Sequence, residues 1–300
     1  MTALQANALL LLTAAIWGFA FVAQRVGMVH LGPFTFNAIR FGLGGLSLVP
    51  LIRGTRSRRE HHAPPRRLLM GGLVAGVILF AGASLQQVGI VTTTAGKAGF
   101  ITGLYVVLVP LSGLLWGERV PWITWLGAAF AGVGLYFLSV TDQLTLAPGD
   151  LWVMLSALCW TAHVHLIARL TQRIDPLPLA AVQFGVCSLL SWITALVSEP
   201  FLWAGVWGGM VPILYGGLMS VGIAYTLQVV AQRYALPTPA AVIMSLESAF
   251  AALGGWLLLG ERLGTRGGVG AALMMVGMVL AQLRRVAVKS RTAAGSTAPV

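Results

Sequence analysis

Ten apolar stretches, each near the length of a membrane span, limit what this chain can fold into more than any other feature. An α-helix needs about 20 apolar residues to cross the hydrocarbon core of a bilayer. The stretches occupy residues 6–26, 34–52, 67–89, 96–116, 121–139, 150–169, 177–197, 209–230, 237–259 and 266–284. The sequence therefore predicts an all-α, polytopic membrane protein with ten transmembrane helices.

The composition agrees with this prediction. Hydrophobic residues make up 57% of the 300 residues and charged residues only 9%, whereas soluble domains carry about 25% charged residues. The connecting segments are short, and even the longest, from Arg53 to Arg67, leaves no room for a soluble domain. No basic residue precedes the first stretch, so we expect a retained span and not a cleaved signal peptide. The small and polar residues 287–300 are predicted to form a disordered cytoplasmic tail.

The basic residues are distributed unevenly between the two sets of connecting segments. If the N-terminus is cytoplasmic, the inner segments contain 14 Lys and Arg residues and the outer segments contain 4. The positive-inside rule then places both termini in the cytoplasm. This topology signal accounts for the net charge of +11, so no nucleic-acid partner is expected. Cys159 and Cys187 lie in apolar stretches and are expected to be free thiols.

The chain also repeats itself at an offset of 143 residues. The matched positions are Trp17 and Trp160, Pro33 and Pro176, Phe41-Gly42 and Phe184-Gly185, Gly117-Glu118-Arg119 and Gly260-Glu261-Arg262, and Gly127-Ala128 and Gly270-Ala271. Residues 1–143 contain five predicted helices and residues 144–286 contain the other five. Because five is odd, the second half starts on the opposite side of the membrane. This predicts two inverted repeats, with a substrate site near the bilayer midplane between them.

These features together resemble the drug/metabolite transporter (DMT) superfamily, in the branch built from two EamA repeats. The resemblance covers about residues 1–285 and is carried by LLTAAIWGFAFVAQRVG, PFTFNAIRFG, LLWGERVPWITWLGAAFAGVGL and LLLGERLGTRGGVGAALMMVGMVL. Within this branch the chain looks like the YddG-type exporters of aromatic and other neutral amino acids, which implies a location in the bacterial inner (plasma) membrane. The resemblance implies a central cavity surrounded by helices 1–4 and 6–9, with helices 5 and 10 at the periphery.

Ionisable side chains within a membrane are costly, and they mark candidate functional sites. Arg40, His163 and Glu247 are the three that fall inside apolar stretches, while the other acidic residues lie at helix ends or in loops. Glu247 is expected to face the cavity and bind a substrate ammonium group or a coupling proton; the alternative is a structural partnership with Arg40 or with a backbone group. Arg40 shares a helix face with Asn37 and is suited to bind a carboxylate; the alternative is an internal salt bridge or a cap on broken helix ends. Its counterpart in the repeat is Gln183, which is also polar.

Aromatic residues supply a second set of candidates. Trp17 and Trp160 are counterparts in the repeat and lie deep in their helices, away from the headgroups where membrane Trp residues usually gather. They either line a cavity for flat apolar substrates or pack in the core. His163, one turn from Trp160, either titrates in the working pH range or hydrogen-bonds a neighbouring helix. His165 cannot share its face, so a metal site is not expected. Further candidates of the aromatic kind are Phe21, Phe80, Tyr105, Tyr215 and Tyr225.

The paired Gly-Glu-Arg sequences are expected to be structural. Glu118-Arg119 and Glu261-Arg262 end helices on opposite membrane faces, where the Arg favours the negative end of the helix dipole. The Glu is expected to hydrogen-bond the helix that follows. Lys97 is expected to extend its ammonium group to the membrane interface.

Other classes of function lack their motifs. Prenyl transfer needs clustered Asp residues, a zinc protease needs His-Glu-x-x-His, and a channel tends to show charge rings or filter loops; the sequence contains none of these. We therefore expect no enzyme activity and no cofactor. The predicted function is secondary transport, by alternating access, that exports aromatic and other neutral amino acids or related metabolites; export of other small metabolites or cationic drugs is the alternative. The expected partners are a small-molecule substrate and the lipid bilayer, and the expected state is a monomer or weak dimer.

Overall fold

A computed structural model describes residues 3–54, 64–116, 120–139, 147–232 and 243–294, and these ranges contain helices and no strand. The first half contains α1 (Ala3–Gly27), α2 (Pro33–Ser47), α3 (Val49–Gly54), α4 (Pro65–Ile90), α5 (Ala95–Gly103), α6 (Tyr105–Ser112), the 3₁₀ turn η2 (Gly113–Trp116) and α7 (Trp122–Ser139). The second half contains α8 (Pro148–Leu170), α9 (Pro176–Ser198), α10 (Trp203–Gly208), α11 (Met210–Leu214), the π-helical η3 (Tyr215–Ala224), α12 (Tyr225–Gln232), α14 (Glu247–Leu259) and α15 (Thr265–Ala294). The predicted all-α class is confirmed.

The described helices follow the predicted apolar stretches in order. Seven helical segments are long and apolar enough to cross a membrane: Leu4–Gly27, Pro33–Gly54, Pro65–Ile90, Ala95–Leu115, Pro148–Ile167, Pro176–Ser198 and Met210–Gln228. Three further apolar helices are shorter: Trp122–Leu138, Ile243–Leu259 and Thr265–Leu280. Length and composition thus identify seven membrane-spanning candidates among the described residues, where the sequence predicted ten.

One local prediction needs correction, and another falls partly outside the described residues. The stretch 237–259 is described only from residue 243, and Glu247 lies within an apolar helix from Ile243 to Leu259 that contains a single turn residue, Leu246. The tail expected to be disordered from residue 287 is helical as far as Ala294, because α15 continues to that residue. Residues 237–242 and 295–300 lie outside the described ranges.

Proline fixes where the long helices begin. Pro33, Pro65, Pro148 and Pro176 occupy the first turns of α2, α4, α8 and α9. The first N–H groups of a helix have no intrahelical partner, so the missing proline N–H costs nothing there, and the fixed φ angle suits the helix. At the other end, Gly260 closes α14 in the left-handed conformation, with φ 64°. That turn directs Glu261 back toward the bundle.

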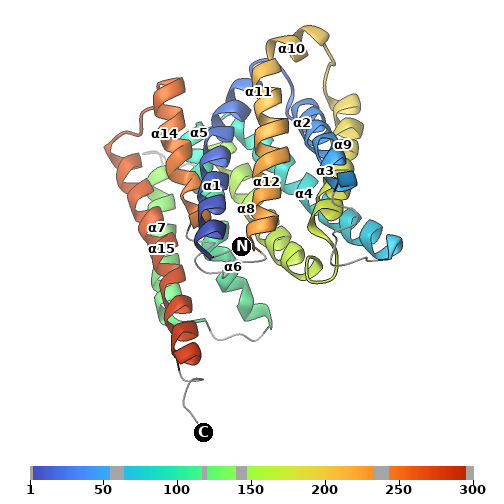
Figure 1. Cartoon of the computed structure of the whole chain (residues 1–300). Coiled ribbons are helices and arrows are strands. Elements are labelled where there is room, and N and C mark those ends of the chain that lie inside the picture. The colour runs from blue at the N-terminus through green and yellow to red at the C-terminus, as the bar shows by residue number, and fades with distance from the viewer. Residues whose placement is uncertain (1–2, 55–63, 117–119, 140–146, 233–242, 295–300) are drawn as a thin grey trace.

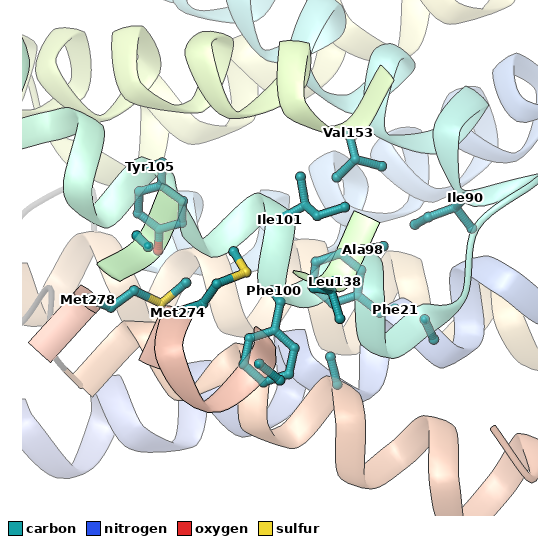
Figure 2. Packing of buried hydrophobic residues seen from close by; sticks show 14 of the residues in the cluster. Phe21, Ile90, Ala98, Phe100, Ile101, Tyr105, Leu138, Val153, Met274 and Met278 are labelled. Atoms are coloured by element: carbon teal, nitrogen blue, oxygen red, sulfur yellow. The ribbon is translucent and has the colours of Figure 1, made fainter. Parts of the chain in front are cut away.

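α7 and α15 form a pair at the edge of the bundle (Figure 1). A Cβ atom on Gly134 would lie 2.5 Å from the carbonyl oxygen of Gly270, and a Cβ on Gly277 would lie 2.5 Å from that of Gly127. The two backbones therefore touch, as small residues allow between membrane helices. Met274 and Met278 of α15 point into the largest buried cluster, which joins this pair to α5 and α6 (Figure 2).

Candidate functional site

A buried cavity lies between the two halves of the chain. Its walls come from α1, α2, α4, α5, α6, α8, η3, α12 and α14, while α7 and α15 contribute nothing to it. The lining residues are Trp17, Ala20, Phe21, Gln24, Arg40, Gln86, Thr102, Tyr105, Trp160, His163, Val164, Ser220, Tyr225, Gln228 and Glu247. The centres of water molecules can occupy about 70 Å³ of this space. A space of this size admits a few water molecules.

Arg40 supplies the positive charge of the cavity and is held rigidly. Its Nε donates to Asn37 Oδ1 at 2.9 Å. Its guanidinium lies 4.7 Å from the ring centroid of Phe41 and 5.7 Å from that of Phe36. The Asn37 amide in turn donates to the carbonyl of Ala83 on α4 at 3.2 Å. These contacts hold the Nε edge and the faces of the guanidinium, and Arg40 as a whole is only 4% exposed. The remaining N–H groups of the guanidinium are suited to bind an oxyanion.

Glu247 supplies the negative charge. The Tyr105 hydroxyl hydrogen-bonds its carboxylate, and its Oε1 is buried without a hydrogen-bond partner among the described residues. Thr102, one turn before Tyr105, also has a buried hydroxyl oxygen with no partner in the described part of the chain. Within that part Arg40 and Glu247 form no ion pair, so the salt bridge left open as an alternative is absent. Both charges therefore remain available to the cavity.

Glu247 is the residue that distinguishes its helix from the counterpart in the repeat. Leu104, between α5 and α6, keeps a right-handed helical conformation, and 143 residues later Glu247 begins α14 directly after Leu246, which has the same conformation. The second half therefore has a carboxylate where the first half has a leucine.

Trp17 and Trp160 both reach the cavity, and each bonds to the opposite half of the chain. Trp17 Nε1 donates to the carbonyl oxygen of Ser220 at 3.2 Å, and its ring makes an edge contact with Tyr225. Trp160 Nε1 donates to Gln86 Oε1 at 2.9 Å. The two indoles consequently connect the halves at the cavity wall.

His163 lines the cavity through its ring and is held from behind. One ring nitrogen, Nε2, is 2.8 Å from Gln183 Oε1, so Gln183 lies one layer outside the lining residues. His165 points elsewhere: its Nε2 is 2.7 Å from the hydroxyl of Ser112. The expectation that the two histidines do not share a face is confirmed.

The structure therefore divides the predicted site residues into two groups. Eight line the cavity: Trp17, Phe21, Arg40, Tyr105, Trp160, His163, Tyr225 and Glu247. Four stand behind it: Asn37 and Gln183 with the contacts given above, Phe80 beside Phe34 with ring centroids 6.5 Å apart, and Tyr215, whose hydroxyl donates to the carbonyl of Ile16 at 3.0 Å.

Sequence reasoning missed the amide and hydroxyl residues of the wall. Gln24, Gln86, Thr102, Ser220 and Gln228 line the cavity, yet no charge or repeat match drew attention to them. An uncharged polar residue on an apolar helix is the only signal, and it is shared by many residues that pack elsewhere.

One end of the bundle is closed by polar ties between the halves. Glu199, after α9, accepts from the N–H groups of Phe34 and Thr35 at 2.8 Å each. Glu261, after α14, accepts from the N–H groups of Ala95 and Gly96 at 2.8 and 3.1 Å. Each carboxylate thus caps the N-terminus of a helix from the first half, where the helix dipole favours a negative charge. A third tie at the same end is the ion pair of Lys97 with Asp150. We call this end, defined by Glu199, Glu261 and Asp150, the capped end.

Two of the ties at the capped end correct predictions. Lys97 does not extend to the interface; it forms an ion pair with Asp150, which lies at a helix end as expected but is fully buried. The Glu of the second Gly-Glu-Arg sequence caps α5 and does not bond to the helix that follows it. Arg262 is exposed, and Glu118 and Arg119 lie outside the described residues.

A bundle of apolar helices that encloses a charged cavity between two similar halves is the architecture of a membrane transporter. The sequence pattern of the EamA-like transporter family matches residues 4–140 and again residues 147–283. The chain belongs to this family, and the resemblance drawn from the sequence is confirmed.

Relatives agree with this assignment. An uncharacterized transporter of Archaeoglobus fulgidus is 30% identical over 276 residues, which cover 92% of this chain and 85% of that protein. The uncharacterized transporter YoaV of Bacillus subtilis is 23% identical over 282 residues, covering 88% and 92% of the two chains. One crystal structure, at 20% sequence identity, superposes with a TM-score of 0.68 over 93% of this chain and 99% of that one, which shows a shared fold.

Proposed function

We propose that this protein is a secondary transporter that exports aromatic and other neutral amino acids, or closely related metabolites, across a bacterial inner membrane. The observation that carries the proposal is the pair of charges in the cavity. Arg40 and Glu247 line the same space without pairing with each other in the described structure. An amino acid carries one carboxylate and one ammonium group, so it complements this arrangement, with Arg40 on the carboxylate and Glu247 on the ammonium group.

The rest of the wall suits a substrate with a flat or apolar side chain. Two indoles and the rings of Tyr105 and Tyr225 face the cavity. Aromatic rings favour offset or edge contacts with other rings, so they attract flat side chains without fixing their identity. Export of another small metabolite or of a cationic drug is the alternative, and Arg40 in the wall disfavours a cation that lacks a carboxylate.

Ten spans in two inverted repeats form part of this proposal. Gly270 and Gly277 are the counterparts of Gly127 and Gly134 at the offset of 143. Gly127 of α7 is in close contact with Gly277 of α15, and Gly134 of α7 is in close contact with Gly270 of α15. Replacing each glycine by its counterpart in the repeat converts the first contact into the second. A two-fold axis in the membrane plane produces this exchange and makes α7 and α15 antiparallel. The same axis underlies alternating access, in which one half moves against the other around a central site.

The charge distribution supports cytoplasmic termini. With that orientation the capped end faces away from the cytoplasm. Glu199, Glu261 and Asp150 then tie the halves together on the outer side of the cavity, and these ties must separate when the site opens outward.

Counterflow into proteoliposomes tests the proposal. Vesicles loaded with unlabelled tryptophan or alanine should accumulate the labelled amino acid, whereas those loaded with a nucleoside or a cationic dye should not accumulate the corresponding label. Arg40→Ala, Glu247→Gln and Trp160→Ala should each reduce flux at wild-type protein levels. Trp122→Ala serves as the control, because Trp122 lies on α7 away from the cavity and is 64% exposed. Accumulation of the dye or nucleoside alone would overturn the substrate class, and wild-type flux in all three variants would overturn the site.

A further inference from the structure

The two cavity indoles are oriented by different kinds of partner. Trp17 gives its N–H to a backbone carbonyl, that of Ser220. Every residue type carries that carbonyl, so the side chain at position 220 has no influence on this bond. The ring is also set by the edge contact with Tyr225, with centroids 4.8 Å apart and planes at 64°. The orientation of Trp17 is thus a property of the fold.

The orientation of Trp160 depends on one side chain. Its N–H donates to Gln86 Oε1 at 2.9 Å. An indole N–H can only donate, so the amide of Gln86 must turn its oxygen toward Trp160. Its NH₂ group then points to Gln24, where it donates to Oε1 at 3.1 Å. Gln86 and Gln24 are 5% and 3% exposed, so water competes little for these bonds.

A second contact restricts the ring plane of Trp160 from the other side. His163 lies at right angles to it, with centroids 6.0 Å apart and planes at 89°. His163 is itself held by Gln183 on α9. With the N–H bonded on one side and a ring packed on the other, the indole presents a defined face to the cavity.

We propose that Gln86 is a specificity-determining positioning residue, which fixes the indole of Trp160 so that flat substrate side chains stack on it. The inference rests on the proposed transport function. It assigns the selectivity for aromatic side chains to the indole of Trp160, whose orientation depends on the side chain of Gln86, whereas the orientation of Trp17 depends on a backbone carbonyl. Gln86 acts through Trp160. Replacing it therefore weakens binding of a substrate that uses the indole face and leaves a substrate with a small side chain unaffected.

The test compares KM for tryptophan and for alanine in proteoliposomes. Gln86→Leu is expected to raise KM for tryptophan by about 5-fold, the effect of losing one neutral hydrogen bond, with KM for alanine unchanged. Gln86→Glu keeps an oxygen for the indole N–H and should restore KM for tryptophan. Trp122→Ala is the control, because Trp122 lies on α7 away from the cavity, and it should change neither KM.

A double-mutant cycle shows whether Gln86 acts through Trp160. Trp160→Phe keeps a ring but has no N–H, so it should produce a similar loss, and adding Gln86→Leu to it should produce no further loss. Additive losses, equal changes in both KM values, or an equal effect of Trp122→Ala would each overturn the inference.

If the wild type transports neither amino acid, the proposed function fails and the positioning is tested by fluorine NMR of fluorotryptophan-labelled protein. The signal of residue 160, assigned by its loss in Trp160→Phe, should shift in Gln86→Leu and stay in place in Trp122→Ala. An unmoved signal in Gln86→Leu would show that Gln86 does not position the indole.

Discussion

Lys97 in the first turn of α5 forms an ion pair with Asp150 in the first turn of α8. The Asp150 side chain is fully buried, and that of Lys97 is 21% exposed. The hydroxyl of Thr93 donates to the other carboxylate oxygen, Oδ1. The pair joins the two halves at the capped end, and it leaves the Asp150 carboxylate dependent on a single cation.

Lys97→Met should destabilise the protein strongly. Methionine fills much of the space but leaves a buried carboxylate without its cation, and breaking a buried pair in this way costs about 3 kcal/mol or more in free energy of unfolding. The thermal unfolding midpoint of detergent-solubilised protein should fall accordingly. Lys97→Met combined with Asp150→Asn removes both charges and should recover most of the loss. A double variant no more stable than Lys97→Met would contradict the uncompensated charge as the cause.

Glu261→Ala should also destabilise the capped end. It removes an acceptor from the N–H groups of Ala95 and Gly96, and the loss of a helix cap costs about 1–2 kcal/mol. Gly255→Ala offers an independent route to the same loss, because a Cβ atom there would collide with the Glu261 carboxylate. Thermal unfolding should show similar midpoints for the two single variants and little further change in the double variant. Additive shifts would mean that Gly255 matters for another reason.

Much of the helical frame could be predicted from the sequence, because a membrane span is specified by length and hydrophobicity alone. The candidate charges of the site followed from the same physics, since an ionisable group in an apolar stretch is rare. Arg40 and Glu247 indeed line one cavity. The repeat indicated that Trp17 and Trp160 have equivalent positions, and both indoles reach that cavity.

The remaining parts depend on packing between helices that no single stretch encodes. Asp150 looked like an ordinary helix-end acid, and only the approach of α5 reveals its burial and its partner. Gln86 has no charge, so its role follows only from the indole that it faces. Glu261 caps a helix far away in the chain, whereas sequence order favoured the neighbouring helix.

Gly134→Ala should weaken the pairing of α7 and α15. The new Cβ would lie 2.5 Å from the carbonyl oxygen of Gly270, closer than the two backbones can accommodate without moving apart. Gly132 on the same helix is the matched control, because a Cβ there meets no atom within 4 Å. Gly132→Ala should be neutral or stabilising by up to about 1 kcal/mol, the helix-propensity difference between the two residues. Thermal unfolding measures the stability of both variants. Equal effects of Gly134→Ala and Gly132→Ala would exclude close backbone packing as the cause of the destabilisation.

Arg40→Lys should separate recognition of the substrate carboxylate from general effects on the fold. Lysine keeps the positive charge but has no Nε donor for Asn37 and no flat group to pack beside Phe36 and Phe41. Loss of a charge-assisted contact to the carboxylate should weaken tryptophan binding by about 10-fold or more. Tryptamine has the same indole and ammonium group without the carboxylate, so its inhibition constant against transport should stay unchanged. The exposed Arg262 provides a control, since Arg262→Lys should alter neither constant. Equal weakening of tryptophan and tryptamine in Arg40→Lys would show that Arg40 shapes the cavity and does not bind the carboxylate.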